Sequence, residues 1–147
     1  MKAFFAGSFN PFTAGHASIV ERALTVFDSV TVAIGINAKK PTDAAELNRR
    51  LETIRAVYAD NPRVEVMLFD TLAVEAARRC GAGVLLRGVR SVADFEYERN
   101  MADINRRLSG IETVLMYALP EHEALSSSIV RELSSYGVDV TPFIAKK

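Results

Sequence analysis

The segment 7–16, GSFNPFTAGH, combines several features that bind phosphate groups. Gly7 follows a short apolar run and allows the backbone to turn, and Gly15 and His16 open a helical pattern. The first N–H groups of a helix are free to bind anions, and a histidine beside them can donate to a phosphate oxygen. The spacing matches neither the phosphate loop that ends in Gly-Lys-Ser/Thr nor the three-glycine dinucleotide fingerprint. The residues alone leave two interpretations open, a phosphate-binding turn or a capped helix with a solvent-facing histidine.

Three further groups of polar residues follow apolar runs. Lys39 lies in the polar stretch 37–43, and Arg87 stands beside Gly88 after the run 84–86. Lysine and arginine are the cations that hold phosphates, and serines at a helix start supply hydroxyl donors. Such serines open the pattern at 126–128. Ordinary roles stay open for all three groups: a solvated lysine, an arginine paired with a carboxylate, and serines that only cap a helix.

Alternating apolar runs and helical patterns position these residues. The sequence predicts strands at 3–6, 30–36, 64–69, 84–86 and 113–118, and helices at 15–27, 45–58, 71–80, 95–108 and 128–136. This alternation predicts an α/β fold, a five-stranded parallel sheet with helices on both faces. Ligands of such sheets bind beyond the carboxyl ends of the strands. We therefore expect the polar residues described above to gather at one edge of the sheet.

Composition predicts a single domain spanning residues 1–147, because 49% hydrophobic and 24% charged residues are a normal globular balance. The formal net charge is zero, so composition makes no case for binding nucleic acid or an anionic membrane surface. Cys80 is the one cysteine, which excludes an intrachain disulfide, and we interpret it as a packing residue at a helix end. The chain shows neither a signal-peptide pattern nor an apolar run of about 20 residues, so we expect a cytoplasmic protein.

Three motifs resemble those of a known family. Residues 7–16 are similar to the T/H-x-G-H signature of the nucleotidyltransferase superfamily, in its T-x-G-H form. Residues 86–98, LRGVRSVADFEYE, resemble the R-G-[LV]-R-x-x-x-D-[FY]-E-Y-E block of the bacterial phosphopantetheine adenylyltransferases. Residues 126–132, SSSIVRE, resemble that family's I-S-S-S-x-[VL]-[RK]-E. The resemblance spans residues 3–143, and the three motifs together are specific to the family.

The resemblance implies transfer of AMP from ATP to 4'-phosphopantetheine, which yields dephospho-coenzyme A and pyrophosphate in coenzyme A biosynthesis. The acceptor carries its own attacking phosphate, so the protein has to position the reactants and stabilise negative charge. His16 is implied to contact the α-phosphate and to stabilise the transition state. The residues implied to bind ATP are Ser8, Phe9, His16, Gly88, Val89, Arg90, Glu98, His122, Glu123, Ala124, Leu125, Ser126, Ser127 and Ser128. Those implied to bind 4'-phosphopantetheine are Ser8, Lys39, Leu72, Ala73 and Arg87.

Some of these assignments keep an alternative. Lys40 is adjacent to Lys39 and competes for its role, and Glu98 also reads as one more charge on a solvated helix face. Asn10 stands where the family usually has Asp, and Ser8 where it often has Thr. His122 replaces an aromatic residue of many relatives, and we expect it to contribute backbone contacts and not to act as a base.

The resemblance further implies Mg²⁺ bound together with ATP, a homohexamer, and coenzyme A as a feedback ligand. No metal-ligand cluster is visible in the sequence, so we expect Mg²⁺ to arrive with the ATP phosphates. The chain ends soon after Phe143, without the longer C-terminal helix of some family members.

Three other functions are weighed against this one. A nicotinate-nucleotide adenylyltransferase usually has His at the position of Thr13 and lacks the block at 87–98, and a cytidylyltransferase is disfavoured for the same reasons. A non-catalytic ATP-binding sensor needs no second-substrate site. The combination of His16, Lys39 and Arg87 argues against such a sensor.

Overall fold

Five parallel strands form one sheet in the order β3-β2-β1-β4-β5, as the sequence predicts for an α/β fold. The computed structural model describes residues 1–37, 39–40 and 42–147. The strands are β1 (Lys2–Gly7), β2 (Ser29–Gly35), β3 (Val64–Phe69), β4 (Val84–Val89) and β5 (Glu112–Tyr117). The helices are α1 (Ala14–Ala23), α2 (Ala44–Val57), α3 (Ala73–Arg79), α4 (Val92–Ser109) and α5 (Ser127–Ser135). Two short 3₁₀ turns are η1 (Pro120–His122) and η2 (Thr141–Phe143).

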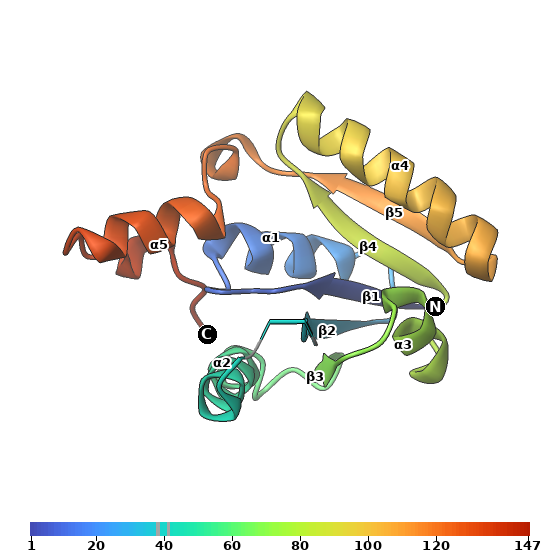
Figure 1. Cartoon of the computed structure of the whole chain (residues 1–147), viewed down its shortest axis with the longest axis horizontal. Helices are drawn as coiled ribbons and strands as arrows, with labels where there is room; N and C mark the ends of the chain where they lie inside the picture. Colours follow the sequence, from blue (N-terminus) through green and yellow to red (C-terminus); the bar gives the residue numbers. More distant parts are fainter. Residues whose placement is uncertain (38, 41) are drawn as a thin grey trace.

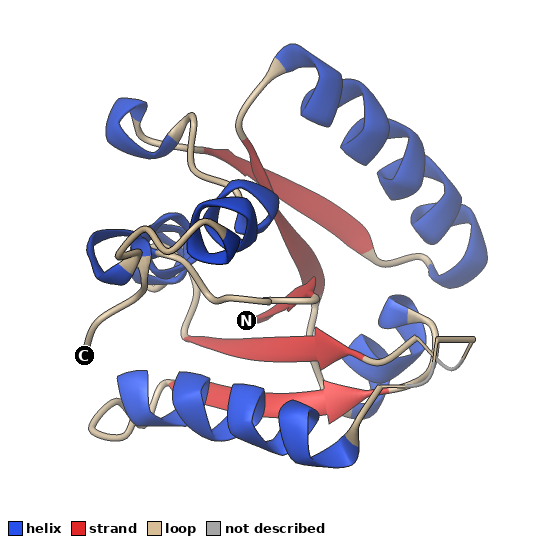
Figure 2. Ribbon diagram, turned by 60° about the vertical axis from the view of Figure 1, so that its left-hand side comes forward, coloured by secondary structure: helices blue, strands red, loops and turns tan. Residues whose placement is uncertain are grey.

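Helices cover both faces of the sheet (Figure 1, Figure 2). Successive residues of a strand point to opposite faces, so each strand feeds two cores. Ala3 and Phe5 of β1 belong to the core that α1 and α2 cover. Phe4 and Ala6 belong to the smaller core that α3 covers. Because both faces are buried, the strands read as continuous apolar runs in the sequence.

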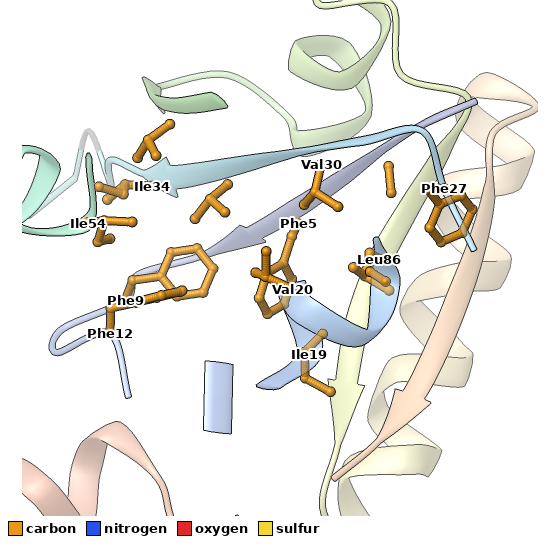
Figure 3. Packing of buried hydrophobic residues seen from close by; sticks show 14 of the residues in the cluster. Phe5, Phe9, Phe12, Ile19, Val20, Phe27, Val30, Ile34, Ile54 and Leu86 are labelled. Atoms are coloured by element: carbon orange, nitrogen blue, oxygen red, sulfur yellow. The ribbon is translucent and has the colours of Figure 1, made fainter. Parts of the chain in front are cut away.

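The loop after β1 is held down by its own aromatic side chains. Phe9 and Phe12 are 3% and 4% exposed and extend the larger core (Figure 3). The ring of Phe9 lies edge-on to both neighbours, with its centroid 5.1 Å from that of Phe5 and 5.3 Å from that of Phe12. A Cβ atom on Gly7 would lie 3.0 Å from the buried Phe9 ring, so a larger residue at this position would have to displace that ring. The aromatic anchors therefore fix the backbone of the loop against the sheet.

The central strands β1 and β4 create the crevice that positions the site. The chain winds from β1 outward to β3, then returns to β4 and winds outward to β5 in the other direction. The loops that leave the carboxyl ends of β1 and β4 therefore diverge. This is the topological switch point at which open parallel sheets bind ligands.

Three predicted boundaries differ from the structure by three residues or more, and the others by no more than two. The first helix ends at Ala23 and not at 27. In the residues that follow it, the carbonyls of Leu24 and Phe27 accept hydrogen bonds from the Arg63 side chain. The fourth strand continues through Val89, since it pairs with β5 as far as Tyr117. Residues 87–89 therefore belong to a strand and not to a loop. Helix α4 begins at Val92, three residues earlier than predicted.

Candidate active site

A cleft of about 360 Å³ opens at the carboxyl ends of β1 and β4. Its walls come from the loop after β1, the start of α1, the end of β4, and the segment that leads into α5. The predicted site residues that line it are Ser8, Phe9, His16, Arg87, Gly88, Val89, Arg90, Glu98, His122, Leu125, Ser126, Ser127 and Ser128. The cleft therefore gathers residues that are up to 120 positions apart in the sequence.

Thr13 and His16 form a reciprocal cap at the start of α1. The His16 N–H donates to Thr13 Oγ1 at 3.2 Å, and the Thr13 N–H donates to His16 Nδ1 at 3.0 Å. Because Nδ1 accepts a hydrogen bond, the proton of the neutral imidazole sits on Nε2. Threonine and histidine of the T-x-G-H motif thus set the tautomer, and they leave an N–H donor on the other side of the ring.

The His16 ring is partly buried among aromatic residues. It stacks on Phe12 with a centroid distance of 5.5 Å and an interplanar angle of 18°, and it meets Phe9 edge-on at 5.0 Å. Burial, followed by the guanidinium groups of Arg90 and Arg87, lowers the pKa of His16 from 6.5 to about 4. His16 is therefore a neutral hydrogen-bond donor at pH 7 and not a cation.

Arg87 and Glu98 form a fork-to-fork pair at the base of the cleft. Arg87 Nε lies 3.1 and 3.0 Å from the two carboxylate oxygens, and Nη2 lies 2.8 Å from Oε1. Arg87 Nη1 donates to the carbonyl of Ala6. Glu98 is 8% exposed by its side chain, so the alternative of a charge on a solvated face is wrong. Of the five N–H groups of Arg87, two have no partner among the described residues, one on each terminal nitrogen, and these two can bind a ligand.

The three serines before and within α5 have different tasks. Ser126 is the N-cap, and its hydroxyl accepts from the Ile129 N–H at 3.1 Å. Ser127 donates to the carbonyl of Pro11 at 2.8 Å, which ties α5 to the loop after β1. Ser128 accepts from Arg131 at 3.2 Å. Capping thus accounts for one serine, and the Ser128 hydroxyl keeps a proton that it can donate into the cleft.

A second pocket of about 200 Å³ adjoins the first on the face of the sheet that carries α3 and α4. Ala6, Arg87 and Glu98 line both pockets. The remaining wall is largely apolar and includes one amide side chain: Phe4, Ala73, Leu85, Tyr97, Met101, Ala102, Asn105 and Thr113. The two pockets therefore meet at the Arg87–Glu98 pair.

Some predicted residues are not brought together with the others. Four predicted residues line neither pocket: Lys39, Leu72, Glu123 and Ala124. Ala73 lines only the second pocket. Lys39 is exposed in the segment after β2, where its N–H donates to the Asn37 side chain at 3.0 Å.

Sequence reasoning also missed several lining residues. Arg131 lies within the quoted motif 126–132, and the Ser128–Arg131 spacing of one helical turn is a signal that could have found it. Tyr97, Met101 and Asn105 follow one another at intervals of four along α4, which places them on one helix face. Asp94 lines the cleft and accepts from the Arg90 N–H at 3.0 Å.

The carboxylates in the described part of the cleft are Asp94 and Glu98, and each already pairs with an arginine. Across the described residues, no group of three or more His, Cys, Asp or Glu side chains could hold a metal ion. In the same part of the chain, no helix combines the length and apolar character needed to cross a bilayer.

The chain is similar to known proteins along nearly its whole length. The cytidylyltransferase-like family model matches residues 4–133. The phosphopantetheine adenylyltransferase of Bacteroides thetaiotaomicron is 50% identical over 143 residues, which are 97% of this chain and 94% of the relative. The protein of that name from Porphyromonas gingivalis is 51% identical over 142 residues, which are 97% of this chain and 92% of the relative.

Solved structures of adenylyltransferases share the fold. A bifunctional NMN adenylyltransferase/ADP ribose pyrophosphatase from Francisella tularensis superposes with a TM-score of 0.68 at 13% identity, covering 99% of this chain and 44% of the other. A putative nicotinate-nucleotide adenylyltransferase from Vibrio parahaemolyticus superposes with a TM-score of 0.61 at 19% identity, covering 97% and 92%. At these identities the likeness shows the fold alone. The sequence matches decide the family, and the chain belongs to the phosphopantetheine adenylyltransferases within the cytidylyltransferase-like proteins.

Proposed function

We propose that this chain transfers AMP from ATP to 4'-phosphopantetheine and releases pyrophosphate and dephospho-coenzyme A. The observation that carries the proposal is the junction of two pockets at Arg87. One pocket is rich in phosphate-binding groups, and the other is a mostly apolar slot. A nucleotide triphosphate suits the first, and an acceptor with a phosphate at one end and a long, weakly polar arm suits the second.

In the proposed reaction, an oxygen of the acceptor phosphate attacks the α-phosphorus of ATP in line with the leaving group. A new P–O bond forms, the bond between the α-phosphorus and the bridging oxygen breaks, and pyrophosphate leaves with the electron pair. No side chain has to act as a nucleophile. The chain lowers the barrier by positioning both phosphates and by donating hydrogen bonds to the oxygens on which charge develops.

Several donors of the cleft suit the ATP phosphates. The Nε2–H of His16 suits the α-phosphate, because it is neutral and its tautomer is set by Thr13. The helix starts of α1 and α5 add backbone N–H groups, and Arg90 and Arg131 add positive charge. The remaining residues assigned to ATP are Ser8, Phe9, Gly88, Val89, Glu98, His122, Glu123, Ala124, Leu125, Ser126, Ser127 and Ser128. Glu98 acts in this scheme by orienting Arg87, since both of its oxygens accept from that side chain.

The acceptor is proposed to lie across Arg87. The acceptor phosphate is a suitable partner for the two N–H groups of Arg87 that no described residue binds, and the hydroxyl of Ser8, which also lines the cleft, adds a donor. The arm of the acceptor then follows the second pocket past Ala73 and Asn105. Lys39 and Leu72 complete this assignment from the segments after β2 and β3.

Mg²⁺ is proposed to enter with ATP. Its charge would offset the charge of the departing pyrophosphate, and the fold relative from Francisella tularensis was solved with AMP and a manganese ion. The paired state of Asp94 and Glu98 supports a metal held by phosphate oxygens and water. The chain's own residues contribute by holding the phosphates in place.

Coenzyme A is proposed as a feedback ligand, because it contains both the adenine nucleotide and the pantetheine arm and would span the two pockets. It should therefore compete with both substrates. The cytoplasm is proposed as the site of the reaction, because the reaction uses ATP and because the one cysteine of the chain, Cys80, has no second cysteine with which to form a disulfide.

A homohexamer is proposed from the family resemblance and is supported by the surface of α4. Three exposed large apolar side chains lie on one face of this helix, at spacings of three and four residues: Met101, Ile104 and Leu108. Exposed apolar patches of this kind mark interaction surfaces. Light scattering after size exclusion should give the mass of six chains, and Leu108→Glu should lower it; a monomeric mass for the unsubstituted protein would contradict the proposal.

The decisive test is the release of pyrophosphate by the purified protein with ATP and Mg²⁺. Release is expected with 4'-phosphopantetheine and not with nicotinate mononucleotide, and mass spectrometry should identify dephospho-coenzyme A. Turnover only with nicotinate mononucleotide would overturn the assignment. Binding of ATP without turnover on either acceptor would favour the sensor.

A further inference from the structure

Arg50 is a largely buried cation that the proposed chemistry does not use. It lies in the second turn of α2, and its side chain is only 12% exposed. Nη1 donates to the carbonyl of Ser8 at 3.1 Å, and Nη2 donates to the carboxylate of Glu46. Nε is buried without a hydrogen-bond partner among the described residues. Burying an arginine with an unpaired N–H donor lowers the free energy of unfolding. Packing alone therefore does not explain why an arginine lies here in contact with the Ser8 carbonyl.

That contact fixes the orientation of one peptide group. The Ser8–Phe9 bond is trans, so the Ser8 carbonyl and the Phe9 N–H point in opposite directions. Arg50 does not line the cleft, whereas Ser8 and Phe9 do, so the loop lies between Arg50 and the cleft. A carbonyl directed at Arg50, which lies outside the cleft lining, leaves the opposite side of the peptide, with the Phe9 N–H, to face the cleft. No described residue accepts a hydrogen bond from this N–H.

The backbone at this point is held in an unfavourable conformation. Phe9 has φ of +46°, which non-glycine residues rarely adopt, at a cost on the order of 1–3 kcal/mol. The Phe9 ring is buried between Phe5, Phe12 and His16 and anchors the residue from one side. On the other side, Arg50 holds the carbonyl of the preceding residue, Ser8, by a hydrogen bond. If that carbonyl turned to the cleft, its oxygen would face the phosphates and repel them.

We propose that Arg50 is a positioning residue that holds the Ser8–Phe9 peptide with its N–H directed at the α-phosphate of ATP. This inference rests on the proposed function for its place in catalysis, but its structural part concerns ATP alone. Glu46 restrains the second terminal nitrogen of Arg50 and so keeps the guanidinium plane facing the loop. A backbone N–H aimed at developing charge is worth about 100- to 1,000-fold in kcat when it is fully formed.

The test uses a label that reports on this one peptide. Ser8–Phe9 is the only Ser-Phe pair in the sequence, so ¹³C-carbonyl serine with ¹⁵N-phenylalanine yields a single cross-peak from the Phe9 amide. In the unsubstituted protein, ATP with Mg²⁺ should shift this peak strongly. Arg50→Met keeps a long unbranched side chain at this position but removes the N–H donors. In this variant most of the ATP-induced shift should disappear. At the same time kcat should fall by about 10- to 100-fold, while the KM for ATP changes much less.

The controls separate this role from simple destabilisation. Arg49→Met removes the same charge from the neighbouring, exposed position and should leave both the peak shift and kcat unchanged. Arg50→Lys should restore part of the shift and of kcat, since one ammonium cannot hold Ser8 and Glu46 in the fork geometry. Glu46→Gln should have a smaller effect in the same direction, and it keeps the test open if Arg50→Met does not fold.

An unchanged ATP-induced shift in Arg50→Met would overturn the inference. So would a loss of activity that only follows the unfolded fraction, or an equal loss in Arg49→Met. The spectroscopic arm needs no acceptor. If the unsubstituted protein fails to use 4'-phosphopantetheine but the peak responds to ATP as described, the proposed acceptor is wrong and the role of Arg50 stands.

Discussion

The imidazole of His16 accepts a hydrogen bond from the backbone N–H of Thr13, with 3.0 Å between the Thr13 nitrogen and Nδ1. The first and last residues of the T-x-G-H motif are thus the N-cap and the third residue of α1. The same contact that caps the helix places the proton of the neutral ring on Nε2, where the cleft lies. Helix start and phosphate donor are therefore one structural unit.

His16→Ala is expected to lower kcat by on the order of 100-fold while weakening ATP binding only slightly. The reason is that the Nε2 donor acts on charge that develops in the transition state. Steady-state kinetics with 4'-phosphopantetheine and ATP measures kcat, and calorimetry measures ATP affinity. His16→Gln keeps a capping-box residue at this position and controls for loss of the helix cap. Equal, small losses in kcat and in ATP affinity would contradict a transition-state role.

The lowered pKa of His16 predicts a pH dependence of stability. The folded protein keeps His16 neutral down to about pH 4, whereas the unfolded chain protonates it near pH 6.5. Protons bind preferentially to the unfolded chain between these values, so this residue makes the free energy of unfolding fall as the pH falls from about 6.5 to about 4. The loss is on the order of 3 kcal/mol at most, and it should be absent in His16→Gln. Urea titrations of both proteins at pH 7 and pH 4.5 measure it, and parallel losses would show that His16 titrates normally.

Substitutions in the Arg87–Glu98 pair should affect the free energy of unfolding and the KM for 4'-phosphopantetheine independently. Arg87→Met leaves the buried Glu98 carboxylate unpaired and should cost about 3 kcal/mol of unfolding free energy. The double substitution with Glu98→Leu should recover most of that stability, because two apolar side chains then replace the ion pair. The KM for 4'-phosphopantetheine should stay raised in both proteins. Recovery of a normal KM in the double variant would show that Arg87 has a purely structural role.

Lys39 and Lys40 provide a matched pair for the acceptor phosphate. Both are exposed, and both are tied to Asn37 through their backbone N–H groups. Lys39→Met is expected to raise the KM for 4'-phosphopantetheine by about tenfold, because it removes a point charge from the incoming phosphate. Lys40→Met should leave that KM within about twofold of the unsubstituted value, as expected for an exposed charge. The opposite ranking would transfer the role to Lys40.

Thr31→Val is expected to stabilise the fold. Thr31 is fully buried in β2, and its hydroxyl has no hydrogen-bond partner among the described residues. Valine has the same shape and favours strands, so it removes an unpaired buried hydroxyl without leaving a cavity. The unfolding free energy should rise by about 1 kcal/mol in denaturant titrations with activity unchanged. A decrease would reveal that the hydroxyl has a partner, such as a buried water.

The sequence by itself determined the fold class, because strands buried on both faces read as apolar runs and the helices between them as period-3.6 patterns. It also determined where ligands should bind, since the carboxyl ends of parallel strands share one edge. The motifs at 7–16 and 126–132 could be recognised because their residues are neighbours in the chain. Together with the block at 86–98 and the segment 122–125, they supply the thirteen predicted residues that line the cleft.

Only the tertiary structure decided which polar groups meet. The order of the strands placed β4 beside β1, and the rotation of α4 turned Glu98 toward Arg87 and away from solvent. Arg50 lies 42 positions from Ser8 in the sequence, so no local pattern could reveal that its guanidinium holds that carbonyl. Such contacts depend on how helices pack against the sheet, and packing is set by the summed burial of many side chains and not by the spacing of any one motif.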